Sequence, residues 1–149
     1  MSDKKISLVP VDSENWREVA TLEVHEDQAE FVASGSYYLC LCTYDNLWHP
    51  LAILLEDEVI GFMMWAVDED DGSCWLGGIT IDKEYQGKGY GRRAVKGALQ
   101  MLNREKGYTD FALSYNSENK GARHLYSSMG FEEHDEMEDD EIVARLVIN

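Results

Sequence analysis

The chain has 149 residues, enough for one domain with a substantial hydrophobic core. Its formal net charge of −16 argues against a nucleic-acid partner, because binding a phosphate backbone requires Lys and Arg. The sequence contains no run of about 18 apolar residues, so no membrane span is predicted. The first residues lack an apolar signal segment. We therefore expect a cytoplasmic protein with no membrane partner. Its three cysteines fit no metal-ligand spacing and its four histidines are scattered, so we expect reduced thiols and no metal site.

The first third of the chain predicts one strand followed by helices. Alternating apolar residues indicate a strand from Lys5 to Pro10, and a helix follows it. Residues 26–34 read as a second short helix that stops near Gly35. The alternation from Ser36 to Tyr44 is compatible with a strand, but we favour a short helix that ends before His49-Pro50.

A three-stranded meander is predicted next. The apolar runs Leu51 to Leu55 and Val59 to Val67 are joined by a short acidic turn, which is typical of a hairpin. After a second acidic loop, Cys74 to Ile81 forms the third strand. The pair Gly77-Gly78 inside this strand indicates a bulge, or a backbone that another group approaches closely.

The remaining elements complete a layered fold. An amphipathic helix runs from Arg92 to Lys106, Asp110 to Tyr115 is a strand, and a helix capped by Ser117 or Asn119 ends near Gly130. A last hairpin is expected over residues 131–137 and 142–148. The order β-α-α-β-β-β-α-β-α-β-β predicts one domain of the α/β (α+β) class, a mixed sheet of about seven strands with helices on both faces.

The loop between the third meander strand and the long helix has glycine at every second position, in Gln86-Gly87-Lys88-Gly89-Tyr90-Gly91. Such glycines bare the backbone amides, and at a helix N-terminus these amides and the helix dipole favour an anion such as phosphate. The spacing matches neither the P-loop nor the dinucleotide-binding pattern. A tight turn without a ligand remains the alternative interpretation.

Positive charge is concentrated around this loop. Residues 83–123 contain nine Lys or Arg against four Asp or Glu, a local charge of +5, so the rest of the chain carries −21. One segment therefore suits an anionic ligand, and the remainder would attract cations. A solvated acidic surface without a function is the alternative explanation of the second part.

Two motifs occur together in the second half of the chain. The first is the glycine loop, and the second is Asn119-Lys120-Gly121-Ala122-Arg123-His124-Leu125-Tyr126-Ser127-Ser128-Met129-Gly130-Phe131. In this order and spacing they resemble the GCN5-related N-acetyltransferase family, whose order of elements agrees along nearly the whole chain. The runs from Gln28 to Ala33 and from Tyr85 to Gly89 are similar to the spermidine/spermine N-acetyltransferases of bacteria.

The resemblance implies acetyl-CoA as co-substrate and no metal. The amides of the glycine loop would hold the pyrophosphate, and the end of the preceding strand would pair with the pantetheine arm as an added strand. The cofactor-binding residues expected on this basis are Ile79, Thr80, Ile81, Gln86, Gly87, Lys88, Gly89, Tyr90, Gly91, Arg92, Asn119 and Ala122.

The resemblance also implies a catalytic role for Tyr126. Its phenol, with a reference pKa of about 10, would give a proton to the departing thiolate. An amine would attack the acetyl carbonyl directly in a ternary complex, and a backbone N–H near Ile79 to Ile81 would stabilise the oxyanion. The alternative for Tyr126 is a packed aromatic near the end of an amphipathic helix.

The acceptor is expected to be a small-molecule amine, with spermidine or spermine as the hypothesis. Relatives usually carry an acidic residue on the strand before the pantetheine-binding stretch, whereas this chain has Gly77-Gly78 there. The substrate-binding candidates are therefore Gly77 and the acidic residues of the N-terminal segment, Glu23, Glu26, Asp27 and Glu30. Glu26 and Glu30 would share one helix face. Solvated helix residues are the alternative for these four.

Two other functions stay open. One is acetylation of a different amine, such as an aminoglycoside, an amino acid or a protein N-terminus. The other is a module that binds acyl-CoA without catalysis, which the missing strand carboxylate favours and the presence of Tyr126 opposes. Family members often form dimers, so a homodimer is an expectation without an identified interface.

Overall fold

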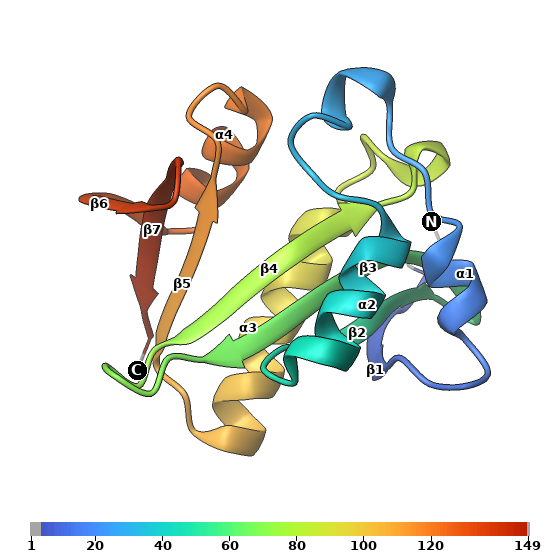
Figure 1. Cartoon of the computed structure of the whole chain (residues 1–149), viewed down its shortest axis with the longest axis horizontal. Helices are drawn as coiled ribbons and strands as arrows, with labels where there is room; N and C mark the ends of the chain where they lie inside the picture. The colour runs from blue at the N-terminus through green and yellow to red at the C-terminus, as the bar shows by residue number, and fades with distance from the viewer. Residues whose placement is uncertain (1–3, 149) are drawn as a thin grey trace.

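The computed structural model describes residues 4–148 and confirms the predicted fold class (Figure 1). Seven strands and four α-helices are present in this part of the chain, with short 3-10 turns at Glu26–Gln28 and Lys83–Tyr85. The elements are β1 (Ile6–Pro10), α1 (Trp16–Ala20), α2 (Gly35–Asp45), β2 (His49–Leu55), β3 (Glu58–Val67), β4 (Cys74–Ile81), α3 (Tyr90–Lys106), β5 (Asp110–Tyr115), α4 (Lys120–Ser128), β6 (Glu132–Glu138) and β7 (Glu141–Val147).

All seven strands form one sheet in the order β1-β2-β3-β4-β5-β7-β6. Every neighbouring pair is antiparallel except β4 and β5, which run parallel. The parallel pair is registered at only two positions, Cys74 with Phe111 and Trp75 with Ala112. Beyond these residues the two central strands diverge, and the sheet opens between them.

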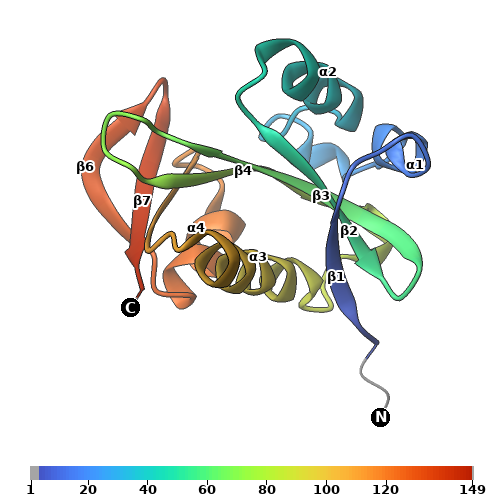
Figure 2. The same ribbon diagram turned by 90° about the horizontal axis from the view of Figure 1, so that it is seen from below.

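Helices cover both faces of the sheet, α3 and α4 on one and α1 and α2 on the other (Figure 2). The larger core lies under α3, whose buried residues include Val95 and Leu102 against Phe111 and Leu113 of β5. The smaller core joins Val19 of α1 and Cys42 of α2 to the opposite face of the sheet. Among residues 4–148, no helix combines the length and the apolar character needed to cross a bilayer.

Local sequence patterns predicted most boundaries. The segment from Ser36 to Tyr44 is helical, as favoured, because the Ser34 side chain accepts a hydrogen bond from the Tyr37 amide at the start of α2. Gly107 ends α3 with φ of 78°, a conformation that glycine adopts without strain. Asn119 caps α4 by accepting from the Ala122 amide.

The predicted helix over residues 26–34 is wrong. Only Glu26–Gln28 forms a single 3-10 turn. Polar groups of this segment form hydrogen bonds with side chains outside it. Gln28 is hydrogen-bonded to Gln86, and the Ala33 amide donates to the Tyr38 hydroxyl. Tertiary contacts therefore override a sequence that favours helix, and Glu26 and Glu30 do not share a helix face.

Candidate active site

A slot opens between β4 and β5 at the centre of the sheet. On the β3 side of β4 the register shifts, because Met64 pairs with Gly77 but Phe62 pairs with Thr80. One extra residue therefore lies on β4, and Gly78 takes a φ of +59°. This is the predicted bulge, and it bends β4 where the two parallel strands separate.

The glycine loop leads from β4 into α3 in an open conformation. Gly87 and Gly89 have φ values of 78° and 82°, and a Cβ built on either would meet nothing within 4 Å. The first hydrogen bond of α3 runs from the Arg93 amide to the Gly89 carbonyl. The preceding amides therefore form the donor end of a 17-residue helix, the geometry that binds anions.

Side chains hold this loop in place. The amide of Gln86 donates to the Ile81 carbonyl and exchanges two hydrogen bonds with Gln28, all at 2.8 Å. Arg92 donates to the Ser128 hydroxyl of α4, so it ties the start of α3 to that helix. Thr80 is buried and donates to the Gly78 carbonyl across the bulge. Lys88 and Tyr90 complete the loop, with Arg93 lying 5.9 Å from the centre of the Tyr90 ring.

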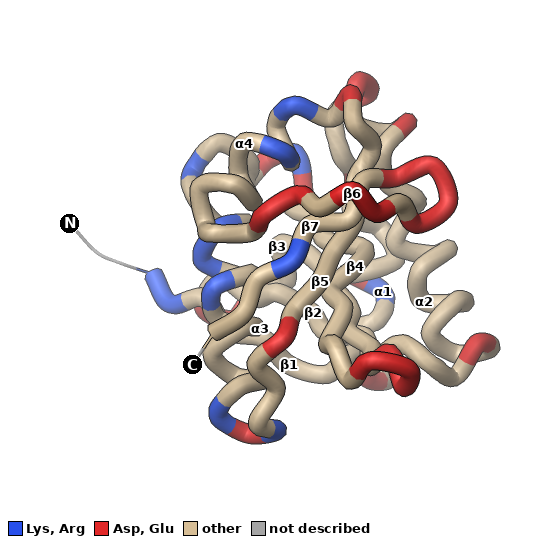
Figure 3. Tube along the Cα trace, turned by 90° about the vertical axis from the view of Figure 1, so that its left-hand side faces the viewer, with Lys and Arg blue, Asp and Glu red and all other residues tan. Residues whose placement is uncertain are grey.

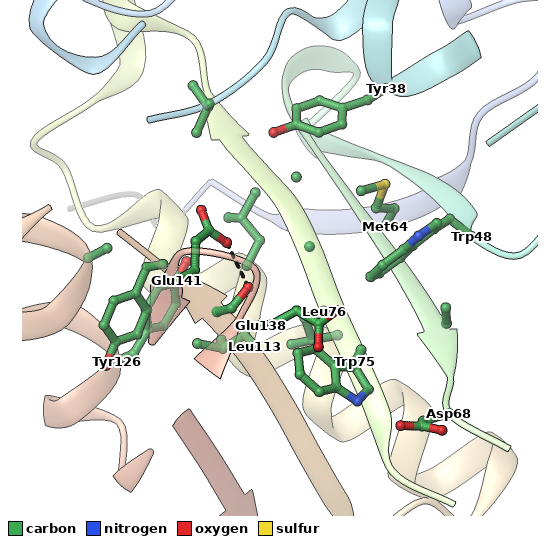
Figure 4. Close-up of a pocket in the computed structure, with 18 of the residues that line it drawn as sticks. Tyr38, Trp48, Met64, Asp68, Trp75, Leu76, Leu113, Tyr126, Glu138 and Glu141 are labelled. Carbon is green, nitrogen blue, oxygen red and sulfur yellow. Dashed lines mark hydrogen bonds between the residues drawn. The ribbon is translucent and has the colours of Figure 1, made fainter. Parts of the chain in front are cut away.

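A cavity of about 760 Å³ extends from the slot (Figure 4). The residues from the sequence prediction that line it come from β4, from α4 and from the residue that caps α4: Gly77, Ile79, Asn119, Ala122 and Tyr126. Three aromatic side chains form part of its wall: Tyr38 of α2, Trp48 directly before β2, and Trp75 of β4. The cavity therefore lies between the strand that carries the bulge and the helix that carries the tyrosine.

The cavity is lined by five carboxylates. Asp68, Glu69 and Asp70 come from the loop between β3 and β4, and Glu138 and Glu141 come from the β6–β7 hairpin. Acidic residues are concentrated along these two segments (Figure 3). No Lys or Arg of residues 4–148 lines the cavity. The arrangement suits a cationic ligand.

Tyr126 is packed between two aromatic rings. Its ring stacks on Tyr115 at 5.9 Å between centres and meets Phe131 edge to face at 6.0 Å. Burial raises the pKa of Tyr126 well above its ordinary value, because the phenolate would lose solvation. The hydroxyl is therefore protonated throughout the physiological pH range and is available as a hydrogen-bond donor.

The cysteines are not arranged for nucleophilic chemistry. Burial raises the pKa of Cys42 to about 11 and that of Cys74 to about 12, so neither forms a thiolate near neutral pH. No cysteine lines the cavity among residues 4–148. In the same residues, no cluster of three or more His, Cys, Asp or Glu side chains is suited to a metal ion.

Comparison with known protein families shows which family has this fold and this glycine loop. The model of the acetyltransferase (GNAT) family matches residues 10–131, from the end of β1 to the residue before β6. The chain belongs to this family. It is an N-acetyltransferase, as the sequence resemblance predicted.

Two relatives of this acetyltransferase come from Bacillus subtilis. A spermine/spermidine N(1)-acetyltransferase of strain 168 is 28% identical over 139 residues, which cover 89% of this chain and 91% of the relative. A probable spermine N(1)-acetyltransferase of subspecies natto is 29% identical over the same lengths.

Solved structures share the fold of the acetyltransferase. The spermidine N-acetyltransferase of Vibrio cholerae, in complex with CoA and spermine, superposes with a TM-score of 0.74 and 21% identity, over 96% of this chain and 94% of that one. An aminoglycoside acetyltransferase in complex with coenzyme A and kanamycin has a TM-score of 0.80 and 15% identity, over 96% and 95%. The expected acetyl-CoA co-substrate is consistent with these CoA-bound structures.

The acidic residues expected to contact the acceptor lie elsewhere in the acetyltransferase. Within the described residues, Glu23, Glu26, Asp27 and Glu30 are absent from the cavity lining, and Glu23 instead lies 3.7 Å from the Lys83 ammonium. The sequence analysis assigned both acidic segments to hairpins and did not identify their five cavity-lining carboxylates as candidates. The available indication in the sequence was that these carboxylates lie at two strand connections, the β3–β4 loop and the β6–β7 hairpin.

Proposed function

We propose that this enzyme transfers the acetyl group of acetyl-CoA to a primary amine of a small polycation, with spermidine or spermine as the acceptor. The observation that carries the proposal is the cavity beside β4, which five carboxylates and no Lys or Arg line among residues 4–148. A polyamine has several ammonium groups joined by apolar chains. Carboxylates and the aromatic faces of Trp48 and Trp75 suit both parts of such a molecule.

The donor would lie across the slot. Its pyrophosphate would accept hydrogen bonds from the amides between Gly87 and Arg92, at the donor end of α3. Its pantetheine arm would run between the diverging β4 and β5 and pair with the backbone from Ile79 to Ile81. Asn119 and Ala122, at the first turn of α4, would contact it from the other side. The open space at Gly87 and Gly89 supports this placement, because side chains there would block the amides.

The reaction would proceed by direct attack of the amine on the acetyl carbon. A backbone N–H near the bulge would stabilise the tetrahedral oxyanion, and Tyr126 would protonate the departing sulfur. An amine with a pKa of about 10.4 is only about 0.1% neutral near pH 7.4, so deprotonation costs on the order of 4 kcal/mol. A site for this reaction therefore needs a route for the proton.

The names of the relatives support the acceptor class. Two relatives that cover most of the chain are named for spermine or spermidine acetylation, at 28% and 29% identity. The cavity carboxylates supply an independent reason for a cationic acceptor, because they belong to this chain. The cytoplasmic location and the homodimer remain predictions from the sequence.

The test is release of CoA thiol from acetyl-CoA with a panel of amines: spermine, spermidine, putrescine, kanamycin, lysine and an N-terminal peptide. We expect kcat/KM to be at least tenfold higher for spermine and spermidine than for the single amino acid. Preference for kanamycin or the peptide would instead assign another amine acceptor. Binding of acetyl-CoA without turnover of any amine would indicate a module that does not catalyse transfer.

A further inference from the structure

Strand β4 has no carboxylate at the bulge, and aromatic side chains crowd the positions where one would stand. A Cβ built on Gly77 would lie 3.2 Å from two atoms of the Trp48 ring. A Cβ on Gly78 would lie 3.1 Å from the Phe62 ring, and the φ of +59° would strain any other residue. The rings of Trp48 and Phe62 therefore crowd the space into which a side chain at Gly77 or Gly78 would point, and the carboxylates of the cavity come from elements other than β4.

Strand β5 faces the bulge from across the slot. The last registered pair is Trp75 with Ala112, so two further steps along each parallel strand bring Ser114 to the level of Gly77. The Ser114 hydroxyl donates a hydrogen bond of 2.7 Å to Oε1 of Glu141. Ser114 and Glu141 both line the cavity. A serine opposite the bulge thus holds a carboxylate that belongs to the first residue of β7.

Glu141 has a different setting from the other cavity carboxylates. Its side chain lies in the space between Tyr126 and β4 (Figure 4). Glu69, Asp70 and Glu138 are exposed, whereas Asp68 and Glu141 are half-buried. Asp68 lies at the far end of the meander, where β4 and β5 are still paired, and its Oδ1 accepts from the Asp70 amide. Of the five, Glu141 alone is fixed by a residue of the opened part of β5.

We propose that Glu141 is the catalytic residue that accepts a proton from the attacking nitrogen, and that Ser114 is its positioning residue. The inference rests on the proposed function. A nitrogen that forms a bond to the acetyl carbon becomes cationic and strongly acidic, so a fixed carboxylate oxygen beside it takes the proton. Glu141 would supply the carboxylate that relatives carry on the strand before the pantetheine-binding stretch, where this chain has Gly77-Gly78.

Each acetyl transfer releases one proton to water. The acceptor enters as an ammonium ion and gives its first proton to water at the mouth of the cavity. The neutral nitrogen attacks the acetyl carbon and passes a second proton to Glu141 as the C–N bond forms. The C–S bond then breaks, and the sulfur takes the proton of Tyr126. Glu141 returns its proton to water and Tyr126 regains one, so each transfer releases one acetylamine, one CoA thiol and one proton.

The experiment measures steady-state kinetics with saturating acetyl-CoA and whichever amine the wild-type enzyme acetylates best. Glu141→Gln keeps the size of the side chain and its capacity to accept from Ser114, and we expect kcat to fall about 100-fold, the low end for loss of a general base. Glu141→Ala leaves space beside Ser114, and added formate should restore kcat at least tenfold. A residue with a purely structural or charge-attracting role would not give formate rescue.

Asp140→Ala is the matched control, because it removes an exposed carboxylate of the same hairpin that does not line the cavity. It should leave kcat and the KM for the amine within about threefold and show no formate rescue. Ser114→Ala should lower kcat severalfold in the wild-type background and not at all in Glu141→Ala. Near wild-type kcat in Glu141→Gln, or no rescue of a folded Glu141→Ala enzyme, would overturn the inference alone. A wild-type protein inactive on every amine would overturn the proposed function and this inference with it.

Discussion

The side-chain amides of Gln28 and Gln86 exchange two hydrogen bonds, each 2.8 Å long, between segments 58 residues apart. Gln86 also donates to the carbonyl of Ile81, the last residue of β4. Both hydrogens of the Gln86 amide nitrogen are therefore used in hydrogen bonds to Gln28 and Ile81. The side chain of this motif residue fixes the entrance of the glycine loop, and any contact with acetyl-CoA would come from the backbone.

We therefore expect Gln28→Ala to weaken CoA binding without changing the chemistry. The variant loses two half-buried hydrogen bonds that order the loop, each contributing about 0.5–1.5 kcal/mol. The dissociation constant for CoA should rise about threefold to tenfold, as measured by calorimetric titration, while kcat at saturating acetyl-CoA changes by less than twofold. Asp27→Ala on the same turn is the control, since no hydrogen bond of the Asp27 side chain occurs within residues 4–148. Equal affinities of Gln28→Ala and wild type would remove Gln28 from this role.

The Gln28 contact also shows where the sequence was insufficient. The run Gln28 to Ala33 favours helix by composition, yet its conformation depends on Gln86 and on Tyr38, which only the folded chain brings close. By contrast, the meander, the bulge at Gly77-Gly78, α3 and the cap at Asn119 depend on local patterns and were predictable.

The candidate site divides in the same way. The glycine loop and Tyr126 lie in contiguous motifs, so they could be identified from the sequence. The cavity carboxylates could not, because Glu141 reaches the slot only through the register of β7 with β5, and the acidic hairpin by itself looks like a solvated turn. A residue that reaches the site only because two strands distant in sequence pair with each other leaves no local sequence pattern.

Tyr126→Phe should lower kcat about 100-fold to 10,000-fold with little change in the affinity for CoA. The substitution removes only the hydroxyl and keeps the packing against Tyr115 and Phe131. Since burial raises the pKa of Tyr126, its hydroxyl stays protonated up to pH 9, so the wild-type kcat should show no falling limb from this group between pH 6 and 9.

Tyr115→Phe is the matched control for this prediction. The Tyr115 hydroxyl donates to Glu133 at 2.7 Å, so its loss should affect stability and change kcat by less than about threefold. Stopped-flow measurement of the first turnover would separate the chemical step from product release. An unchanged rate of acetyl transfer in Tyr126→Phe would exclude Tyr126 as the acid.

Arg145 joins the two acidic segments around the cavity. Its guanidinium donates to both carboxylate oxygens of Glu136 at 2.8 and 2.9 Å, lies 3.5 Å from Asp71 and covers the Trp75 ring at 5.6 Å. The hydrogen bonds from Arg145 lower the pKa of Glu136 in the folded state. Because Glu136 is 41% exposed, solvent screening limits the contribution of the pair to about 0.5–1 kcal/mol.

Glu136→Gln should therefore reduce the free energy of unfolding by about this amount at pH 7, as measured by urea denaturation. A carboxyl group with a lowered folded-state pKa stabilises the protein above its unfolded pKa of about 4.3, and this stabilisation is lost as the pH falls through the folded value. The difference between wild type and Glu136→Gln should be constant from pH 5 to 8 and shrink below about pH 4. Glu132→Gln, on the same strand and without an ion pair among the described residues, should show no such dependence. A difference that persists at pH 3 would show that packing of the side chain, and not its charge, accounts for the effect.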